Sequence, residues 1–293
     1  MGCTYVSGVV TTMDEIVNNQ DPQTVSGFGE EWECFDQSGI SDDELYDNFN
    51  NYFHIFPWSS ISANSAGFDA GCGSGRWAKL VAPKVGQLNC LDASEKALNV
   101  ARKNLQDQQN CNFHLTTLDD VPIPHGSMDF GYCLGVLHHI PDTEKALHSL
   151  VGLLKPGAPL LIYIYYAFDN RPHWFQSLWK ITDVLRYFIS RLPFRPRYIT
   201  SQIIAITIYY PFARLARAFE SIGVNTENFP LSSYRNSSLY TMRTDALDRF
   251  GTRLEKRYTR EQIKKMLIEA GLDKILFSET EPFWCAIGYR KKE

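Results

Sequence analysis

Between residues 66 and 166, short apolar segments alternate with amphipathic ones. The segments between the apolar runs have the polar and apolar spacing of helices. Short apolar strands that alternate with helices predict βαβ units, and therefore an α/β fold with a parallel sheet covered on both faces. The predicted strands are 66–70, 87–92, 112–117, 128–135 and 158–166, and the predicted helices are 76–83, 94–108 and 142–157.

Capping residues support these elements. Ser94 can cap a helix that has Glu95 in its first turn, and Pro156-Gly157 ends the later helix. The segment 259–272 is predicted as an amphipathic helix with Thr259 as its cap and Gly271 as its end. Two further strands, 273–281 and 282–291, follow it.

The flanks differ from this alternation. Residues 1–62 are polar and acidic with interspersed aromatic side chains, and residues 169–237 are rich in aromatic and basic ones. We therefore predict an N-terminal helical cap at 1–62, a core formed by 63–168 and 238–293, and a helical insertion at 169–237. Pro172, Pro193, Pro196 and Pro211 should divide the insertion into separate helices.

The insertion is basic, and its segment 199–213 is apolar but interrupted by polar residues and too short to span a bilayer comfortably. Such a segment suits a substrate lid or a contact between two copies of the chain. It also suits, less well, a helix at a membrane surface.

Composition narrows the function classes. A net charge of −4 gives no support to nucleic-acid binding. The seven cysteines are scattered without zinc spacing, so we expect reduced thiols in the cytoplasm and no metal. The start "MGCTYVSG" has Val6 where N-myristoylation needs Ser or Thr, so neither acylation nor a secretory leader is expected.

Three glycines in five positions follow the first predicted strand, in "FDAGCGSGRWAKL" at 68–80. No Lys-Ser/Thr pair follows, which excludes a phosphate loop, and Arg76 stands where a dinucleotide fingerprint has its third glycine. Asp69 at the strand end would repel a pyrophosphate but suits an ammonium and a sulfonium. The turn therefore favours S-adenosylmethionine, and Asp92 at the end of the second strand can accept two ribose hydroxyls, as it would in an NAD site.

Taken together, "FDAGCGSG", Asp92, "TTLDDVPIPHGSMDFGYCLGVLHHIPD" and "LLKPGAPLLIY" resemble the successive motifs of class I S-adenosylmethionine-dependent methyltransferases. The resemblance implies a Rossmann-like, seven-stranded, mostly parallel sheet whose last two strands form an antiparallel hairpin. "FGEEW" at 28–32, the insertion after the fifth strand and Tyr234-Arg235 resemble a bacterial subgroup often found in sugar and secondary-metabolite gene clusters.

The resemblance also implies the cofactor residues. The family usually has an acid after the third strand, where this chain has Thr117, so the adenine contact departs from the pattern. The implied set is Asp69, Gly71, Cys72, Gly73 and Gly75 for the methionine part, Asp92 and Ala93 for the nucleoside, Thr117 and Leu118 for the adenine, Leu134 and Gly135 for the centre, and Trp32 from the cap.

Methyl transfer is an in-line displacement, so the protein must mainly align the reacting atoms and exclude water. His138 and His139 follow the fourth strand, and each could be a general base or simply pack. Tyr166 ends the fifth strand, where the acceptor pocket should open. We expect Tyr166, Arg171, Tyr234, Arg235 and Trp284 to contact the acceptor, with the arginines holding a carboxylate or phosphate.

The sequence therefore predicts a cytoplasmic methyltransferase that acts on oxygen or nitrogen of a small molecule, in secondary metabolism, with S-adenosylmethionine as cofactor. Two alternatives stay open: an NAD-type oxidoreductase, and a peripheral-membrane methyltransferase with a lipid-like acceptor.

Overall fold

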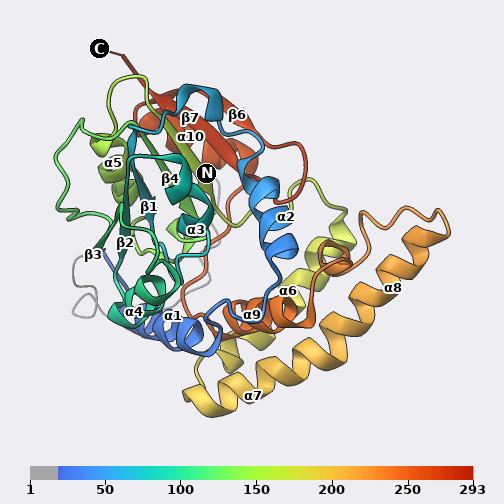
Figure 1. The fold of residues 1–293 in the computed structure, drawn as a ribbon. Coiled ribbons are helices and arrows are strands. Elements are labelled where there is room, and N and C mark those ends of the chain that lie inside the picture. The colour runs from blue at the N-terminus through green and yellow to red at the C-terminus, as the bar shows by residue number, and fades with distance from the viewer. Residues whose placement is uncertain (1–18, 293) are drawn as a thin grey trace.

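The computed structural model describes residues 19–292, which form one seven-stranded sheet with helices on both faces (Figure 1). The strand order is β3-β2-β1-β4-β5-β7-β6. The first five strands are parallel, and β7 is antiparallel to both β5 and β6, as predicted. The strands are β1 (Ala66–Ala70), β2 (Gln87–Asp92), β3 (Cys111–Leu115), β4 (Phe130–Leu134), β5 (Pro159–Tyr163), β6 (Leu272–Phe277) and β7 (Ala286–Arg290).

Four helices pack on the sheet: α3 (Ala78–Val81), α4 (Glu95–Asn104), α5 (Thr143–Leu153) and α10 (Arg260–Glu269). The predicted caps are present, because the Ser94 hydroxyl accepts from the backbone of Ala97 and Thr259 forms a capping box with Gln262. These hydrogen bonds satisfy backbone N–H groups that have no partner inside the helix.

Alternate residues of one strand belong to different apolar clusters. Leu160 and Ile162 of β5 pack with α5 and α10, whereas Leu161 packs with the cluster that includes α3 and α4. The sheet is therefore buried on both faces, which explains its continuous apolar strands.

The chain before β1 forms α1 (Pro22–Cys34) and α2 (Asp42–Phe53). Helix α1 packs on α4, and α2 packs Phe49 and Phe53 into the core on the α3 side of the sheet. Trp32 of α1 lies against Gly73 in the turn after β1, whereas Phe53 and Phe56 contact Tyr132 and Phe130 of β4.

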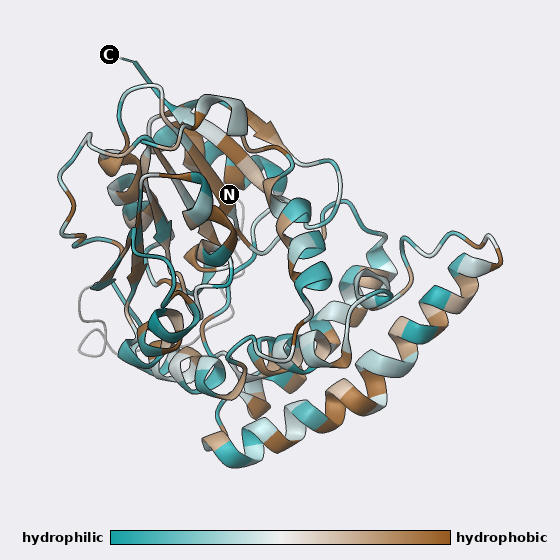
Figure 2. Ribbon diagram, in the orientation of Figure 1, coloured by the Kyte–Doolittle hydropathy of each residue, from teal (hydrophilic) through white to brown (hydrophobic). Residues whose placement is uncertain are grey.

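The insertion forms α6 (His173–Ile189), α7 (Phe194–Ile204), a π-helical turn (Ala205–Tyr209) and α8 (Tyr210–Ser221). Helix α9 (Leu239–Gly251) packs against α7, α6 and α1. In Figures 1 and 2, α7 and α8 form one long arm at the side of the molecule, with apolar and polar residues interleaved along it. The boundaries proposed at residues 62, 168 and 237 remain predictions.

Two of the predicted breaks are wrong. Pro196 lies within the first turn of α7, where no intrahelical donor is needed, and Pro211 continues the arm directly after the π-helical turn. Pro172 and Pro193 do precede helices, as predicted.

Candidate active site

A cavity of about 810 Å³ opens at the carboxyl ends of β1, β2, β4 and β5. Its other walls come from α1, α6, α9, the π-helical turn and the segment before β7. The carboxyl edge of a parallel sheet is where open α/β folds bind their ligands. The cavity therefore lies where the sequence motifs place a cofactor.

The glycine turn forms one wall. Gly71 and Gly73 have positive φ angles, of 74° and 53°, which favour glycine. A Cβ atom on Gly73 would lie 2.8 Å from the indole Nε1 of Trp32, and one on Gly71 would lie 2.4 Å from a methyl group of Val136. The side chains of Trp32 and Val136 therefore lie directly against the glycine backbone, which leaves no room for a Cβ atom at either position.

Asp92 ends β2 and faces the same cavity. One carboxylate oxygen accepts from the Gly73 backbone N–H at 2.9 Å, and the other accepts from that of Ser94 at 2.8 Å. These bonds fix the carboxylate and leave lone pairs on both oxygens for the two hydroxyls of a ribose. The other cofactor residues on the cavity wall are Trp32, Gly71, Cys72, Gly73, Ala93, Thr117, Leu118, Leu134 and Gly135.

Asp69 and Gly75 are corrections to the predicted set, because neither lines the cavity. Asp69 is 1% exposed within β1, and burial raises the pKa of its carboxyl to about 8. Gly75 packs against α4, where a Cβ atom would lie 2.9 Å from a methyl group of Leu105.

His139 lines the cavity and is 5% exposed. Its Nδ1 lies 2.7 Å from the carbonyl oxygen of Leu254, and a carbonyl can only accept, so Nδ1 carries the proton. Nε2 then has a free lone pair, lacks a hydrogen-bond partner among the described residues and lies 3.9 Å from an Asp248 carboxylate oxygen. Burial lowers the pKa of His139, which favours the neutral form that a base requires.

His138 does not line the cavity and is fully buried. Its Nδ1 accepts from the backbone N–H of Tyr165 at 3.2 Å, and its ring stacks on the Tyr165 ring at 3.7 Å. The ring holds the chain that leaves β5, which ends at Tyr163 rather than at the predicted residue 166. The expectation of a catalytic role for His138 is thus corrected to a structural one.

The predicted acceptor residues separate into two groups. Tyr166, Arg171 and Tyr234 line the cavity, whereas Arg235 and Trp284 do not. Arg235 pairs with Glu220 at 2.9 Å on the surface. Trp284 is part of the core, and its indole donates to Asp169 at 2.8 Å. Both assignments are therefore corrected.

Arg171 lies in the wall, but protein groups already hold its guanidinium. It donates to Glu281 and to the carbonyl oxygen of Glu227, both at 2.6 Å, and to the Tyr166 hydroxyl at 3.4 Å. This arrangement does not offer a free cation to a carboxylate or phosphate of an acceptor.

Sequence reasoning missed three acids on the wall: Glu31 from α1, and Asp245 and Asp248 from α9. Glu31 stands inside the "FGEEW" motif, so a signal for it was present. Asp245 and Asp248 are three residues apart and share one helix face, but nothing in their local pattern indicated that α9 borders the cavity.

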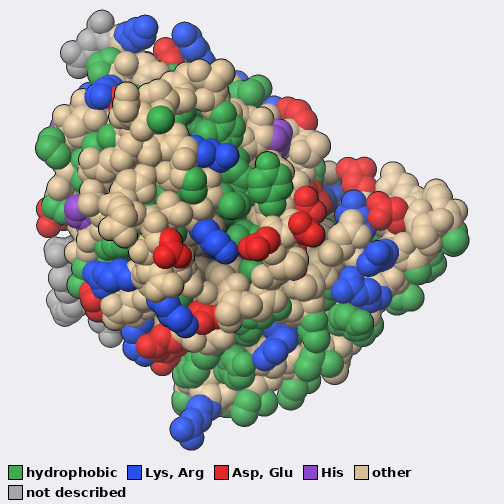
Figure 3. Space-filling view, in the orientation of Figure 1, with side chains coloured by type: hydrophobic (Ala, Val, Ile, Leu, Met, Phe, Trp, Pro, Cys, Tyr) green, Lys and Arg blue, Asp and Glu red, His purple; other side chains and the backbone are tan. Residues whose placement is uncertain are grey.

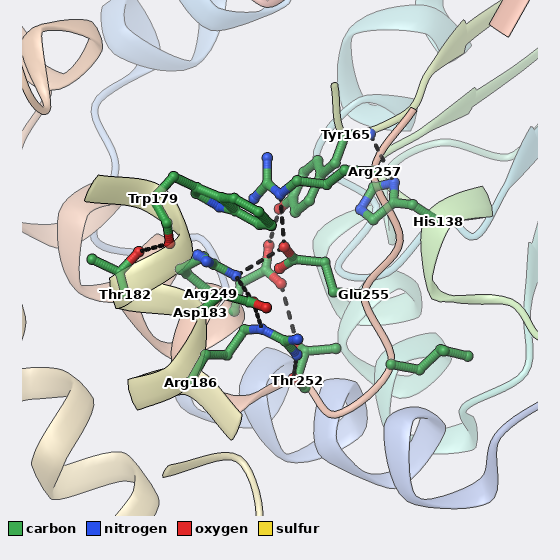
Figure 4. A network of polar contacts seen from close by, with 12 residues as sticks. His138, Tyr165, Trp179, Thr182, Asp183, Arg186, Arg249, Thr252, Glu255 and Arg257 are labelled. Carbon is green, nitrogen blue, oxygen red and sulfur yellow. Dashed lines mark hydrogen bonds and ion pairs between the residues drawn. The ribbon is translucent and has the colours of Figure 1, made fainter. Parts of the chain in front are cut away.

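A buried ionic network lies beside these acids (Figure 4). Glu255 accepts from Arg249 at 2.8 Å and from Arg257 at 2.9 Å, and Asp183 accepts from Arg186 at 2.7 Å. Burial alone would raise the pKa of Glu255, but the guanidinium groups of Arg257, Arg249 and Arg186 outweigh it and lower that pKa to about 2. The network joins α6 and α9 to the chain before α10.

Comparison with known proteins agrees with this geometry. Residues 68–162 match the methyltransferase domain family. The chain is 31% identical over 119 residues to a ubiquinone biosynthesis O-methyltransferase of Thiobacillus denitrificans, a match covering 39% of this chain and 50% of that protein. The ubiquinone biosynthesis O-methyltransferase of Aromatoleum aromaticum is also 31% identical over 119 residues, a match that covers 39% of this chain and 49% of that protein. The chain thus spans about half the length of the curated relatives it matches.

Two solved structures share the fold at low identity. One is a chain of the complex between the Haloferax volcanii Trm112 methyltransferase activator and a methyltransferase, with a TM-score of 0.51, 13% identity and coverage of 91% of this chain and 98% of that one. The other is Haemonchus contortus phosphoethanolamine N-methyltransferase 2, solved with S-adenosylhomocysteine, with a TM-score of 0.51, 15% identity and coverage of 91% and 47%. Residues 68–162 thus match a methyltransferase domain family, and the sheet order and the glycine turn of the core agree with the class I S-adenosylmethionine-dependent methyltransferase fold.

Proposed function

We propose that the protein transfers a methyl group from S-adenosylmethionine to an oxygen or nitrogen atom of a small-molecule acceptor, as in secondary metabolism. The observation that carries the proposal is the joint placement of Gly71, Gly73 and Asp92 on the wall of one cavity. The residues fit the cofactor, since Gly71 and Gly73 carry no side chain into the cavity they line and Asp92 retains acceptor capacity for a diol. A dinucleotide-binding oxidoreductase is not proposed further, because the matched family is a methyltransferase domain.

In this proposal Gly71, Gly73 and Trp32 hold the methionine part of the cofactor, and Asp92 holds its ribose. Thr117 and Leu118 border the adenine. When bound, the cofactor supplies an electrophilic methyl group on a sulfonium. The cap and the insertion surround the cavity and exclude water, so orientation and exclusion supply most of the rate enhancement.

In this proposal His139 receives the proton from the acceptor. Its Nδ1–H bond to Leu254 fixes the ring, and the free Nε2 lone pair belongs to a cavity-lining side chain. For a hydroxyl acceptor, proton removal by such a base contributes about 10²- to 10⁴-fold to the rate. Calorimetry with S-adenosylhomocysteine tests the proposal: we expect binding, and the folded protein failing to bind would refute it.

A second candidate is a methyltransferase that works at a membrane surface on a lipid-like acceptor. Large apolar side chains are exposed along α6, α7 and α8, and Figure 3 shows apolar groups gathered over this arm. Leu178, Leu185, Ile208 and Phe212 are both exposed and part of the cavity wall. No helix among residues 19–292 is long and apolar enough to cross a membrane.

Exposed basic side chains on α6, α7 and α8 favour binding of this surface to an anionic lipid membrane. Lys180 of α6 and Arg195 and Arg217 of the arm are exposed, whereas the acid of the arm, Glu220, is already paired with Arg235. Cosedimentation with phosphatidylglycerol vesicles, and phosphatidylcholine vesicles as the control, tests this candidate. Preferential binding to the anionic vesicles supports it. Equal binding, no binding, or a dimer buried on this face would remove it.

A further inference from the structure

Three of the four guanidinium groups in the cavity wall are paired with carboxylates. Arg171 pairs with Glu281 at 2.6 Å, and Arg249 and Arg257 both pair with Glu255, at 2.8 and 2.9 Å. Arg76 differs, because its guanidinium lies over the rings of Trp77 and Trp32, at 4.5 and 5.4 Å. The wall thus offers little free positive charge to an anionic ligand.

The acids of the same wall are not balanced in this way. The side chain of Glu31 is 4% exposed and lines the cavity, and it has no hydrogen-bond or ion-pair partner among residues 19–292. Burying a carboxylate without a partner costs free energy. The presence of Glu31 in this wall therefore indicates that a bound ligand supplies the missing partner. Asp245 and Asp248 face the same space from α9.

The neighbouring carboxylates also raise one another's pKa. Burial, and then the carboxylates of Asp248 and Asp245, raise the pKa of Glu31 well above its usual range. Burial likewise raises the pKa of Asp245 to about 6, with Asp248 adding to the rise and Arg76 opposing it. A cation placed among the three carboxylates would relieve this repulsion.

The net charge of the cavity wall exceeds what the cofactor alone would balance. Seven carboxylates and four guanidiniums line the cavity, which leaves three negative charges when all are ionised: Asp21, Glu31, Asp92, Glu227, Asp245, Asp248 and Glu281 against Arg76, Arg171, Arg249 and Arg257. S-adenosylmethionine, with its ammonium, sulfonium and carboxylate, brings a single net positive charge. Two negative charges remain after the cofactor binds.

Aromatic rings surround the same acids. The Tyr165 hydroxyl donates to Asp248 at 2.5 Å, and Tyr52 and Tyr234 belong to the same cavity wall as Asp245. All three tyrosines line the cavity. Ring faces next to carboxylates form a favourable site for an organic cation.

We propose that the acceptor is an organic amine that binds as its cation, that Glu31 and Asp245 hold the ammonium group beside the tyrosine side chains, and that one of these carboxylates takes its proton before the neutral nitrogen attacks the methyl carbon. This inference rests on the proposed methyltransferase function and names its class of substrate. It reverses the sequence-based expectation of an anionic acceptor group held by arginine.

The test uses the full chain saturated with S-adenosylhomocysteine and three probes of matched size: 2-phenylethylamine, 2-phenylethanol and 3-phenylpropionate. Calorimetry at neutral pH should show the amine binding about tenfold or more tightly than the alcohol, and the carboxylate binding least, since a charged hydrogen bond contributes about 1.5–3 kcal/mol. Equal affinities for amine and alcohol, or no binding of the amine at millimolar concentrations, would overturn the proposal.

Two variants locate the site. Glu31→Gln and, independently, Asp245→Asn should each weaken amine binding about 10- to 100-fold and leave the alcohol nearly unaffected. Glu30→Gln is the matched control, because Glu30 is next in the same helix, pairs with Arg197 at 3.0 Å and does not line the cavity. Amine preference should persist in this control.

Parallel titrations with S-adenosylhomocysteine keep the two proposals distinguishable. A wild-type protein that binds neither S-adenosylhomocysteine nor amine fails the proposed function itself. A Glu31→Gln protein with weakened S-adenosylhomocysteine binding and intact amine preference assigns Glu31 to the cofactor and overturns the amine site.

Discussion

The indole of Trp32 lies against the backbone of Gly73, so closely that a Cβ atom on Gly73 would come within 2.8 Å of the indole nitrogen. Trp32 belongs to α1 in the N-terminal cap, and Gly73 belongs to the turn after β1. Cap and core therefore meet at the cofactor turn. This contact ties the position of the cap to the shape of the proposed methionine site.

Gly73→Ala should therefore weaken S-adenosylhomocysteine binding by about tenfold or more, because the new methyl group must displace the Trp32 indole. Gly223→Ala is the matched control: Gly223 also has a positive φ, of 82°, but nothing lies within 4 Å of its Cβ position. Both variants should lose about 1 kcal/mol of stability from backbone strain. If both retain wild-type affinity in calorimetry, the contact does not shape the site.

Asp69→Asn should stabilise the protein increasingly as pH rises. The wild-type carboxyl has a folded-state pKa of about 8 against an ordinary value of 3.8, so ionisation of the unfolded chain favours unfolding across this interval. The amide removes that dependence. Urea unfolding of both proteins from pH 4 to 8 should show a stability difference that grows by several kcal/mol and then levels off. A constant difference would contradict the buried, proton-retaining carboxyl.

His139→Asn should keep a donor near the Leu254 carbonyl while removing the Nε2 lone pair. We expect unchanged S-adenosylhomocysteine affinity and about 10²- to 10⁴-fold slower methyl transfer to a hydroxyl acceptor, measured as S-adenosylhomocysteine formation. Because burial lowers the pKa of His139, wild-type activity should fall only below the usual histidine range, and the variant should lack that acidic decline. Wild-type rates in the variant would leave His139 with a packing role alone.

The ionic contacts should differ sharply in their effect on stability. Glu255→Gln removes the partner of Arg249 and Arg257 inside the protein, which should cost about 3–5 kcal/mol. Arg235→Ala breaks a partly exposed surface pair and should cost no more than about 1 kcal/mol, with unchanged ligand binding. Thermal and urea unfolding measure both. A similar small loss in the two variants would show that the network around Glu255 contributes little.

The fold was predictable because the apolar runs, the helix caps and the glycine turn all indicated the same architecture. Apolar runs gave β1, β2, β4 and β5, caps such as Thr259 marked the helices, and the glycine turn with Asp92 placed the cofactor wall. The resemblance supplied the antiparallel hairpin. Each of these signals is local in sequence, so the pattern alone contains it.

The acceptor side was less predictable because it depends on contacts between distant segments. His138 and His139 are neighbours in sequence, yet one holds the Tyr165 backbone and the other faces the cavity. Arg171 looked like a free cation until the fold brought Glu281 to it. Pro211 suggested a break because the π-helical turn that accommodates it leaves no mark in the pattern of polar and apolar residues.

The central claim is that the turn after β1 and Asp92 bind S-adenosylmethionine. Calorimetric titration of the wild type and Asp92→Ala with S-adenosylhomocysteine, alongside NAD, tests it most directly. We predict binding of S-adenosylhomocysteine and not of NAD by the wild type, and about 10- to 100-fold weaker binding by the variant, since two ribose hydroxyls lose a charged acceptor. Failure of the folded wild type to bind S-adenosylhomocysteine, or equal affinity in the folded variant, would contradict the account.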